Sequence, residues 1–189
     1  MKLSNIVVLT CICFMILLSG CITQENDIIP HENLDLSTVG LALSDFFEDY
    51  EIISEEHITE PYVVQEGLVF EGWRIIEKFE SSFRTNPHTF IIQQLSKHSS
   101  IFNASLFIDE IKYQEFDYDF TLYSEEAIGD NSYIAFSQAK VFEKDSTLYL
   151  ISYSIDNIAV VLVSSFHDYE TALYYAQIIE EKITEKIER

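Results

Sequence analysis

The chain contains 189 residues and has a formal net charge of −21, because 32 acidic residues outnumber 11 basic ones. A surface this acidic repels phosphate groups, which argues against a nucleic-acid-binding protein. Hydrophobic residues make up 48% of the chain and aromatic residues 14%, so a chain that stays disordered is excluded and one domain with a sizeable core is expected.

The first 20 residues have the pattern of a secretory signal peptide. Lys2 supplies a positive charge near the start, residues 6–18 are almost all apolar, and the small residues Ser19 and Gly20 precede Cys21. A charged start, a short apolar run and a small-residue cleavage site define such a signal. A membrane-spanning helix needs about 20 apolar residues, so an uncleaved anchor is the weaker alternative. Ordinary secretion is a second alternative.

The sequence Leu18-Ser19-Gly20-Cys21 resembles the lipobox of bacterial and archaeal lipoproteins. The resemblance implies that the Cys21 thiol receives a diacylglyceryl group and that the mature chain begins at this residue. Two acyl chains hold a protein stably on a membrane, whereas one chain binds only marginally. We therefore expect the membrane to be a partner through the lipid anchor and the protein to face outside the cytoplasm. Other envelope proteins are candidate partners, and nucleic acid is not.

The cysteines lie at the N-terminus. Cys11 and Cys13 belong to the apolar segment, and Cys21 is the predicted lipidation residue, so no thiol is left for a disulfide or a thiolate metal site in the mature domain. Lys2 is the one charged residue that cleavage removes, which leaves 10 basic residues and a net charge of −22. The stretch that follows Cys21 is polar and reads as a flexible tether. The predicted organisation is a signal peptide (1–20), a lipidated cysteine with its tether (21–35) and one globular domain (36–189).

Alternating apolar residues predict strands in the N-terminal half of the domain. Residues 73–84 alternate well, with Ile75, Phe79 and Phe83 on one side and charged residues on the other. The turn-forming residues 85–88 lead into a second strand over 89–95. Further segments are predicted less directly from the pattern: strands at 50–58 and 116–123, a short helical turn at 61–67, and a helix capped by Ser99 or Ser100 that carries Phe102, Leu106 and Ile111.

The C-terminal half predicts a three-stranded meander followed by a long helix. Strands are expected over 133–142, 148–155 and 158–163, with turn residues Gly129-Asp130-Asn131-Ser132 before the first of them. Asp156-Asn157 forms the second hairpin turn, because both residue types tolerate positive φ. Asp168 is the expected N-cap of the helix. Apolar residues then recur at steps of three and four: Ala172, Ala176, Ile179, Ile183 and Ile187.

Together these elements predict an α+β domain. A mainly antiparallel sheet of about five to seven strands, including the C-terminal meander, is packed by two main helices, one of them C-terminal. In this outline the domain resembles uncharacterised small α+β lipoproteins of archaea and bacteria, and more loosely the PsbP/Mog1-like α/β/α sandwich. The likeness covers the order of elements only, so it carries over no site residue.

No motif for catalysis or for a cofactor stands out. The five histidines lack the spacing of a helical metal site, and solvated turn or strand-end positions are the expectation for them. Asp117 and Asp119 would share one strand face and offer oxygen ligands to calcium, but 32 acidic residues make chance pairs common. The predicted set of catalytic residues, metal ligands and cofactors is therefore empty. Asn103 begins a glycosylation sequon on the predicted helix, and its occupancy is left open.

One group of basic residues is a candidate binding surface. Alternation places Arg74, Lys78 and Arg84 on the same strand face, where they would accept an anion or an acidic partner. The alternative is local neutralisation by acids such as Glu80. We predict a non-enzymatic binding or interaction module at the cell surface. A pocket with convergent carboxylates or a histidine would instead favour a carrier of a small ligand or metal, or a hydrolase without a recognisable motif.

Overall fold

The computed structural model describes residues 31–63, 74–86, 88–112, 120–124, 128–141, 144–166 and 168–188. Eight strands in these residues form one antiparallel sheet in the order β1-β3-β4-β8-β7-β6-β5, with β2 pairing with β3 beside this path. The predicted α+β class and the mainly antiparallel sheet are thus confirmed, with one strand more than expected. The elements are η1 (Leu36–Thr38), η2 (Leu43–Asp45), β1 (Glu51–Ile58), β2 (Tyr62–Val63), β3 (Arg74–Asn86), β4 (Thr89–His98), α2 (Ile101–Ile111), β5 (Thr121–Ser124), β6 (Asn131–Val141), β7 (Lys144–Ile155), β8 (Ile158–Ser164) and α3 (Tyr169–Ile187).

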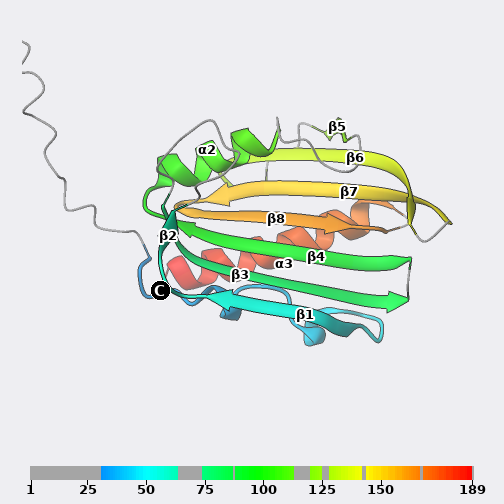
Figure 1. Cartoon of the computed structure of the whole chain (residues 1–189), viewed down its shortest axis with the longest axis horizontal. Helices are drawn as coiled ribbons and strands as arrows, with labels where there is room; N and C mark the ends of the chain where they lie inside the picture. Colours follow the sequence, from blue (N-terminus) through cyan, green and yellow to red (C-terminus); the bar gives the residue numbers. More distant parts are fainter. Residues whose placement is uncertain are drawn as a thin grey trace, which may run out of the picture.

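The two long helices cover opposite faces of the sheet. Figure 1 shows α2 in front of β6 and β7, with α3 behind the strands. Because side chains alternate along β7, Tyr149, Ile151 and Tyr153 pack in the large core with α3, while Leu150 packs with Ile111 of α2. The result is a three-layer arrangement in which the central strands are buried on both sides. In the part of the chain described here, no helix is long and apolar enough to cross a membrane.

The C-terminal meander and helix form as predicted. β6, β7 and β8 pair in sequence, and Asp156 adopts a φ of 50° in the turn between β7 and β8. β7 begins at Lys144, four residues before the predicted start of this strand. Asp168 caps α3 by accepting a hydrogen bond of 2.8 Å from the Thr171 amide. The buried stripe of α3 includes four of its five predicted residues: Ala172, Ala176, Ile179 and Ile183.

Helix α2 forms where predicted but turns a different face to the sheet. Ser100 caps it, accepting from the Asn103 amide. The buried residues are Ala104, Ile108 and Ile111, whereas Phe102 is 70% exposed. Successive residues are 100° apart on a helix, so Phe102 lies almost opposite Ala104. Of the three apolar residues that marked the predicted helix, Ile111 is buried, Leu106 is half-buried and Phe102 points away from the sheet.

The N-terminal half contains the other differences from the predictions. The alternation of β3 is confirmed, with Ile75, Phe79 and Phe83 buried. The helical turn predicted at 61–67 is wrong at Tyr62–Val63, which form strand β2 against β3. The predicted strand at 116–123 appears as β5, beginning at Thr121. Cys21 and the calcium candidates Asp117 and Asp119 lie outside the described residues.

Gly129 in the turn before β6 has a conformation that a side chain would disturb. Its φ is +63°, and a Cβ built there would lie 2.3 Å from the Ser154 carbonyl oxygen. The left-handed backbone alone costs an alanine about 1–2 kcal/mol, and the collision adds to that. We expect Gly129→Ala to lower the free energy of unfolding by about 2 kcal/mol in urea titrations. Gly129→Asn tolerates the φ but keeps the collision, so full stability in this variant would contradict the steric explanation.

Candidate ligand-binding pocket

The predicted basic surface on β3 is interleaved with acids. The Lys78 ammonium lies 2.7 Å from a Glu80 carboxylate oxygen, and Arg84 Nε lies 2.7 Å from Glu51 of the neighbouring strand. Arg74 belongs to β3, but its side chain is not among those described. Such surface pairs contribute about 0–1 kcal/mol each, and they leave less free positive charge for an anion. The anion site therefore stays a prediction, and the alternative of local neutralisation has direct geometric support.

A buried polar network links the segment before η1 to the sheet. The Glu77 carboxylate on β3 accepts hydrogen bonds from the Leu36 amide at 2.8 Å and from Lys97 Nζ at 2.7 Å, and His57 Nε2 lies 2.8 Å from it. Lys97, which is 1% exposed, also donates to the backbone carbonyls of Glu32 and Leu34. Residues 31–35, assigned to the tether by the sequence, thus contact the domain.

The same network contains the closest approach to a metal site among the described residues. Ligand atoms of Asp35, His57 and Glu77 lie within 4.8 Å of one another. However, Lys97 Nζ lies 2.7 Å from Glu77, and both Glu77 oxygens already accept hydrogen bonds. A cation would have to displace that ammonium. The arrangement is that of an ion-pair network which fastens the N-terminal segment to β3 and β4.

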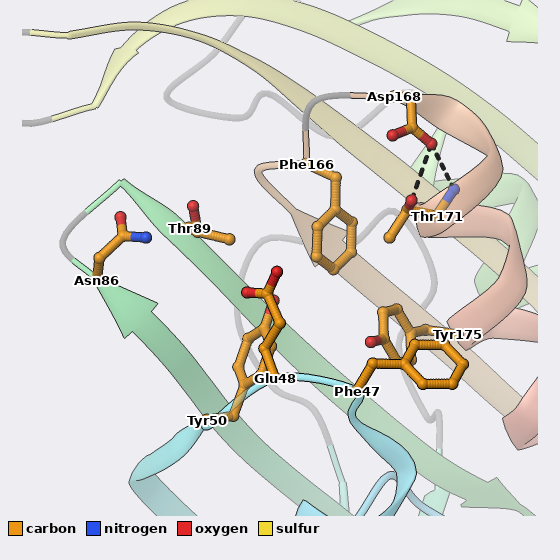
Figure 2. Close-up of a pocket in the computed structure, with 9 residues that line it drawn as sticks. All are labelled: Phe47, Glu48, Tyr50, Asn86, Thr89, Phe166, Asp168, Thr171 and Tyr175. Atoms are coloured by element: carbon orange, nitrogen blue, oxygen red, sulfur yellow. Dashed lines mark hydrogen bonds between the residues drawn. The ribbon is translucent and has the colours of Figure 1, made fainter.

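A pocket of about 460 Å³ lies where four distant parts of the chain meet. Its walls come from four segments: the loop before β1, the ends of β3 and β4, the segment after β8 and the first turns of α3 (Figure 2). This volume is within the range of about 300–1,000 Å³ for small-molecule sites. Nine described residues line it: Phe47, Glu48, Tyr50, Asn86, Thr89, Phe166, Asp168, Thr171 and Tyr175.

Ring contacts hold the aromatic walls of the pocket in place. Phe46 stacks on Tyr50 with ring centroids 4.2 Å apart, and it also contacts Phe83 and Tyr175 at 5.0 Å. Phe166 stacks on Tyr175 at 5.5 Å. Because Tyr175 and Phe166 are buried in the main core, these rings are fixed by the same packing that joins α3 to the sheet. The walls are therefore preorganised rather than assembled around a ligand.

Two carboxylates give the pocket a negative character. Figure 2 shows the Glu48 carboxylate projecting between Tyr50 and Phe166, and Asp168 at the top of the cavity. Burial, followed by the neighbouring Tyr175 and Glu48, raises the pKa of Tyr50 well above its usual value. Burial also raises the pKa of Tyr175, and the neighbouring Tyr174, Glu48 and Asp45 raise it further. Both phenols therefore stay neutral at physiological pH, and the acidic charge that remains is on the carboxylates.

None of the nine lining residues was predicted from the sequence as a binding residue. Asp168 was predicted as a helix cap, which it is, but its place beside the pocket depends on the packing of α3. The other lining residues are spread over more than 120 positions and share no local pattern. The signal that was present is the segment Phe46-Phe47-Glu48-Asp49-Tyr50, in which three aromatic and two acidic residues stand together just before the first strand.

Comparisons with known protein families, curated proteins and solved structures find no match to this chain. The likeness to lipobox lipoproteins and to PsbP/Mog1-like sandwiches therefore stays a prediction from sequence.

Proposed function

We propose that this protein is a lipid-anchored binding protein on the outer face of the cell membrane, and that the pocket beside the start of α3 is where it binds. The anchor in this proposal is a diacylglyceryl group on Cys21, supported by the lipobox-like Leu18-Ser19-Gly20-Cys21. The first described residue, His31, follows ten positions later, so a short segment separates the lipid from the domain. Function as a binding module agrees with the domain's size and acidic surface.

A single observation supports a small ligand over a protein partner. The pocket is concave, with a volume of about 460 Å³, and it combines aromatic walls with polar groups from separate elements. Small-molecule sites have this composition, apolar and aromatic walls with a few placed polar groups. Glu48 and Asp168 both line this pocket, and carboxylates in a pocket favour a ligand carrier or a hydrolase over a flat interaction surface.

The anchor is tested by Cys21→Ser. We expect the wild-type protein to fractionate with membranes and to partition into the detergent phase of Triton X-114, because two acyl chains bind stably. The variant cannot form the thioether and should leave the membrane fraction. Mass spectrometry of the wild-type N-terminus should find a diacylglyceryl cysteine. A variant that stays membrane-bound after alkaline extraction would instead support an uncleaved spanning segment.

The binding function is tested on the lipidated protein purified from its own membranes. Native mass spectrometry should detect a small molecule that leaves on denaturation. A parallel cross-linking and pull-down experiment looks for envelope proteins. Recovery of a protein partner in stoichiometric amounts, with no small molecule in any preparation, would contradict the proposal of a ligand pocket and support an interaction module.

A further inference from the structure

We propose that the pocket binds a small organic cation, of the alkylammonium or quaternary ammonium class. This inference rests on the proposed function, since it names the ligand class of the same pocket. Four of the nine lining residues are aromatic: Phe47, Tyr50, Phe166 and Tyr175. The face of an aromatic ring carries negative charge density and attracts a cation within about 6 Å of its centroid. Aromatic side chains that line a site recognise quaternary ammonium groups, which cannot donate hydrogen bonds.

The charges at the pocket have the sign that a cation requires. Glu48 and Asp168 line the cavity, and no described lining residue is Lys, Arg or His. Neither carboxylate is paired with a basic side chain in the part of the chain described here, and the Asp168 bonds go to Thr171. The whole chain adds to this effect through its net charge of −21, which raises the local concentration of cations.

The start of α3 does not reverse this preference. A helix N-terminus carries a partial positive charge of about one half, which favours anions. Here the Asp168 carboxylate already accepts a hydrogen bond from the Thr171 amide, and Glu170 follows in the first turn. Two full negative charges therefore outweigh the dipole. The polar groups Asn86 and Thr89, on the far side of the cavity, can accept hydrogen bonds from a ligand hydroxyl or ammonium.

The assignment is tested by titrating the lipidated full-length protein, in a non-ionic detergent, with three probes of nearly equal shape. Choline carries a trimethylammonium group, 3,3-dimethylbutan-1-ol is its uncharged carbon isostere, and 3,3-dimethylbutyrate is anionic. We expect calorimetry to show choline binding at least about ten-fold more tightly than the neutral isostere, with no binding of the anion. Glycerophosphocholine, the headgroup form of the same cation, should bind more weakly because the carboxylates of Glu48 and Asp168 repel its negatively charged phosphate.

Matched variants connect the binding to the pocket. Glu48→Gln with Asp168→Asn should weaken choline binding about ten-fold or more, and the Asn amide oxygen can still cap α3. Phe47→Leu, at a ring that is 81% exposed and so outside the core, should weaken it about two- to five-fold. Asp49→Asn is the control, since it removes one exposed charge beside the pocket without lining it, and we expect less than a two-fold change.

The outcomes separate the ligand class from the proposed function. Equal binding of choline and its neutral isostere, or choline binding that the double variant leaves unchanged, would overturn the cation assignment. Tighter binding of glycerophosphocholine would overturn the assignment to a free cation. If the neutral or anionic probe perturbs NMR signals of the pocket residues, the ligand class is wrong but a binding pocket remains. If no probe perturbs them and no ligand co-purifies, both proposals fail.

Discussion

Glu77→Gln should lower the free energy of unfolding by about 3–5 kcal/mol. The substitution leaves the shape of the side chain nearly unchanged but removes the charge that faces Lys97, whose ammonium is 2.7 Å away and almost fully buried. A buried ammonium without a counter-charge has lost its hydration and gained only backbone carbonyls in exchange. Urea unfolding monitored by circular dichroism measures the loss directly.

The reason for this large effect lies in how many elements meet at Glu77. Its carboxylate accepts from the Leu36 amide and from Lys97 of β4, and His57 of β1 lies beside it. Lys97 in turn holds the carbonyls of Glu32 and Leu34. Loss of the charge therefore loosens the segment 31–36 as well as the strand pair. We expect amide hydrogen exchange to accelerate first in that segment, ahead of β7 and β8.

Two variants control this experiment. Glu80→Gln makes the same chemical change three residues along β3, at a half-buried pair with Lys78 on the sheet surface, and should cost no more than about 1 kcal/mol. Replacing both buried partners, Glu77→Leu with Lys97→Met, should restore much of the loss, because apolar residues of similar size often match or exceed a buried ion pair. A single Glu77→Gln variant as stable as Glu80→Gln would contradict the prediction. It would mean that other groups stabilise the buried Lys97 ammonium as well as the Glu77 carboxylate does.

How far the fold follows from the sequence depends on whether the pattern is local. Alternation in β3 and the three-and-four spacing in α3 each place many apolar residues on one face, so the predicted strand and helix are confirmed. Phe102 shows the limit, since the apolar residues of α2 are spread around the helix and do not reveal which face the sheet will cover. The two-residue strand β2 exists only because Tyr62 meets Ile75, a pairing without local signal.

The candidate site was less predictable than the fold. Asp168 could be predicted because capping is a local interaction within one turn. Glu77 and Lys97, by contrast, look like ordinary charged residues in alternating strands. They are buried because the segment ending at Leu36 covers that end of the sheet face, a contact across 41 positions. Likewise, Glu48 and Asp168 approach one pocket only after α3 packs on the sheet. Long-range packing, which sequence periodicity does not encode, creates both sites.

His98 is the clearest departure from what the sequence suggested. It was expected to be a solvated strand-end residue, yet it is fully buried at the end of β4, with its ring 5.1 Å from that of Phe107 on α2. Its Nε2 atom lies 3.0 Å from the Ser96 hydroxyl, and its backbone carbonyl accepts from the Asn157 side chain. Burial lowers the pKa of His98 to about 4, because the charged imidazolium would lose its hydration.

This burial predicts a specific acid sensitivity. In the unfolded chain the pKa of a histidine is about 6.5, so between pH 6.5 and 4 the unfolded state binds a proton that the folded state does not. The contribution of the buried, neutral His98 to the free energy of unfolding is therefore fully present above pH 6.5. It falls as the pH is lowered, by about 3 kcal/mol in total near pH 4. Urea titrations at pH 7, 5.5 and 4.5 should show this decline in the wild type.

Removal of the imidazole should remove that part of the pH dependence. His98→Gln keeps a polar group of similar length near Ser96 but does not titrate, so its unfolding free energy should change much less between pH 7 and 4.5, whatever its value at pH 7. Ser96→Ala keeps the buried histidine and should retain the wild-type decline. The lowered pKa values of Asp35 and Asp109 affect stability only in more acidic solution, below their unfolded values, so they do not account for a decline in this window. A His98→Gln variant with the wild-type decline would mean that other groups take up the proton.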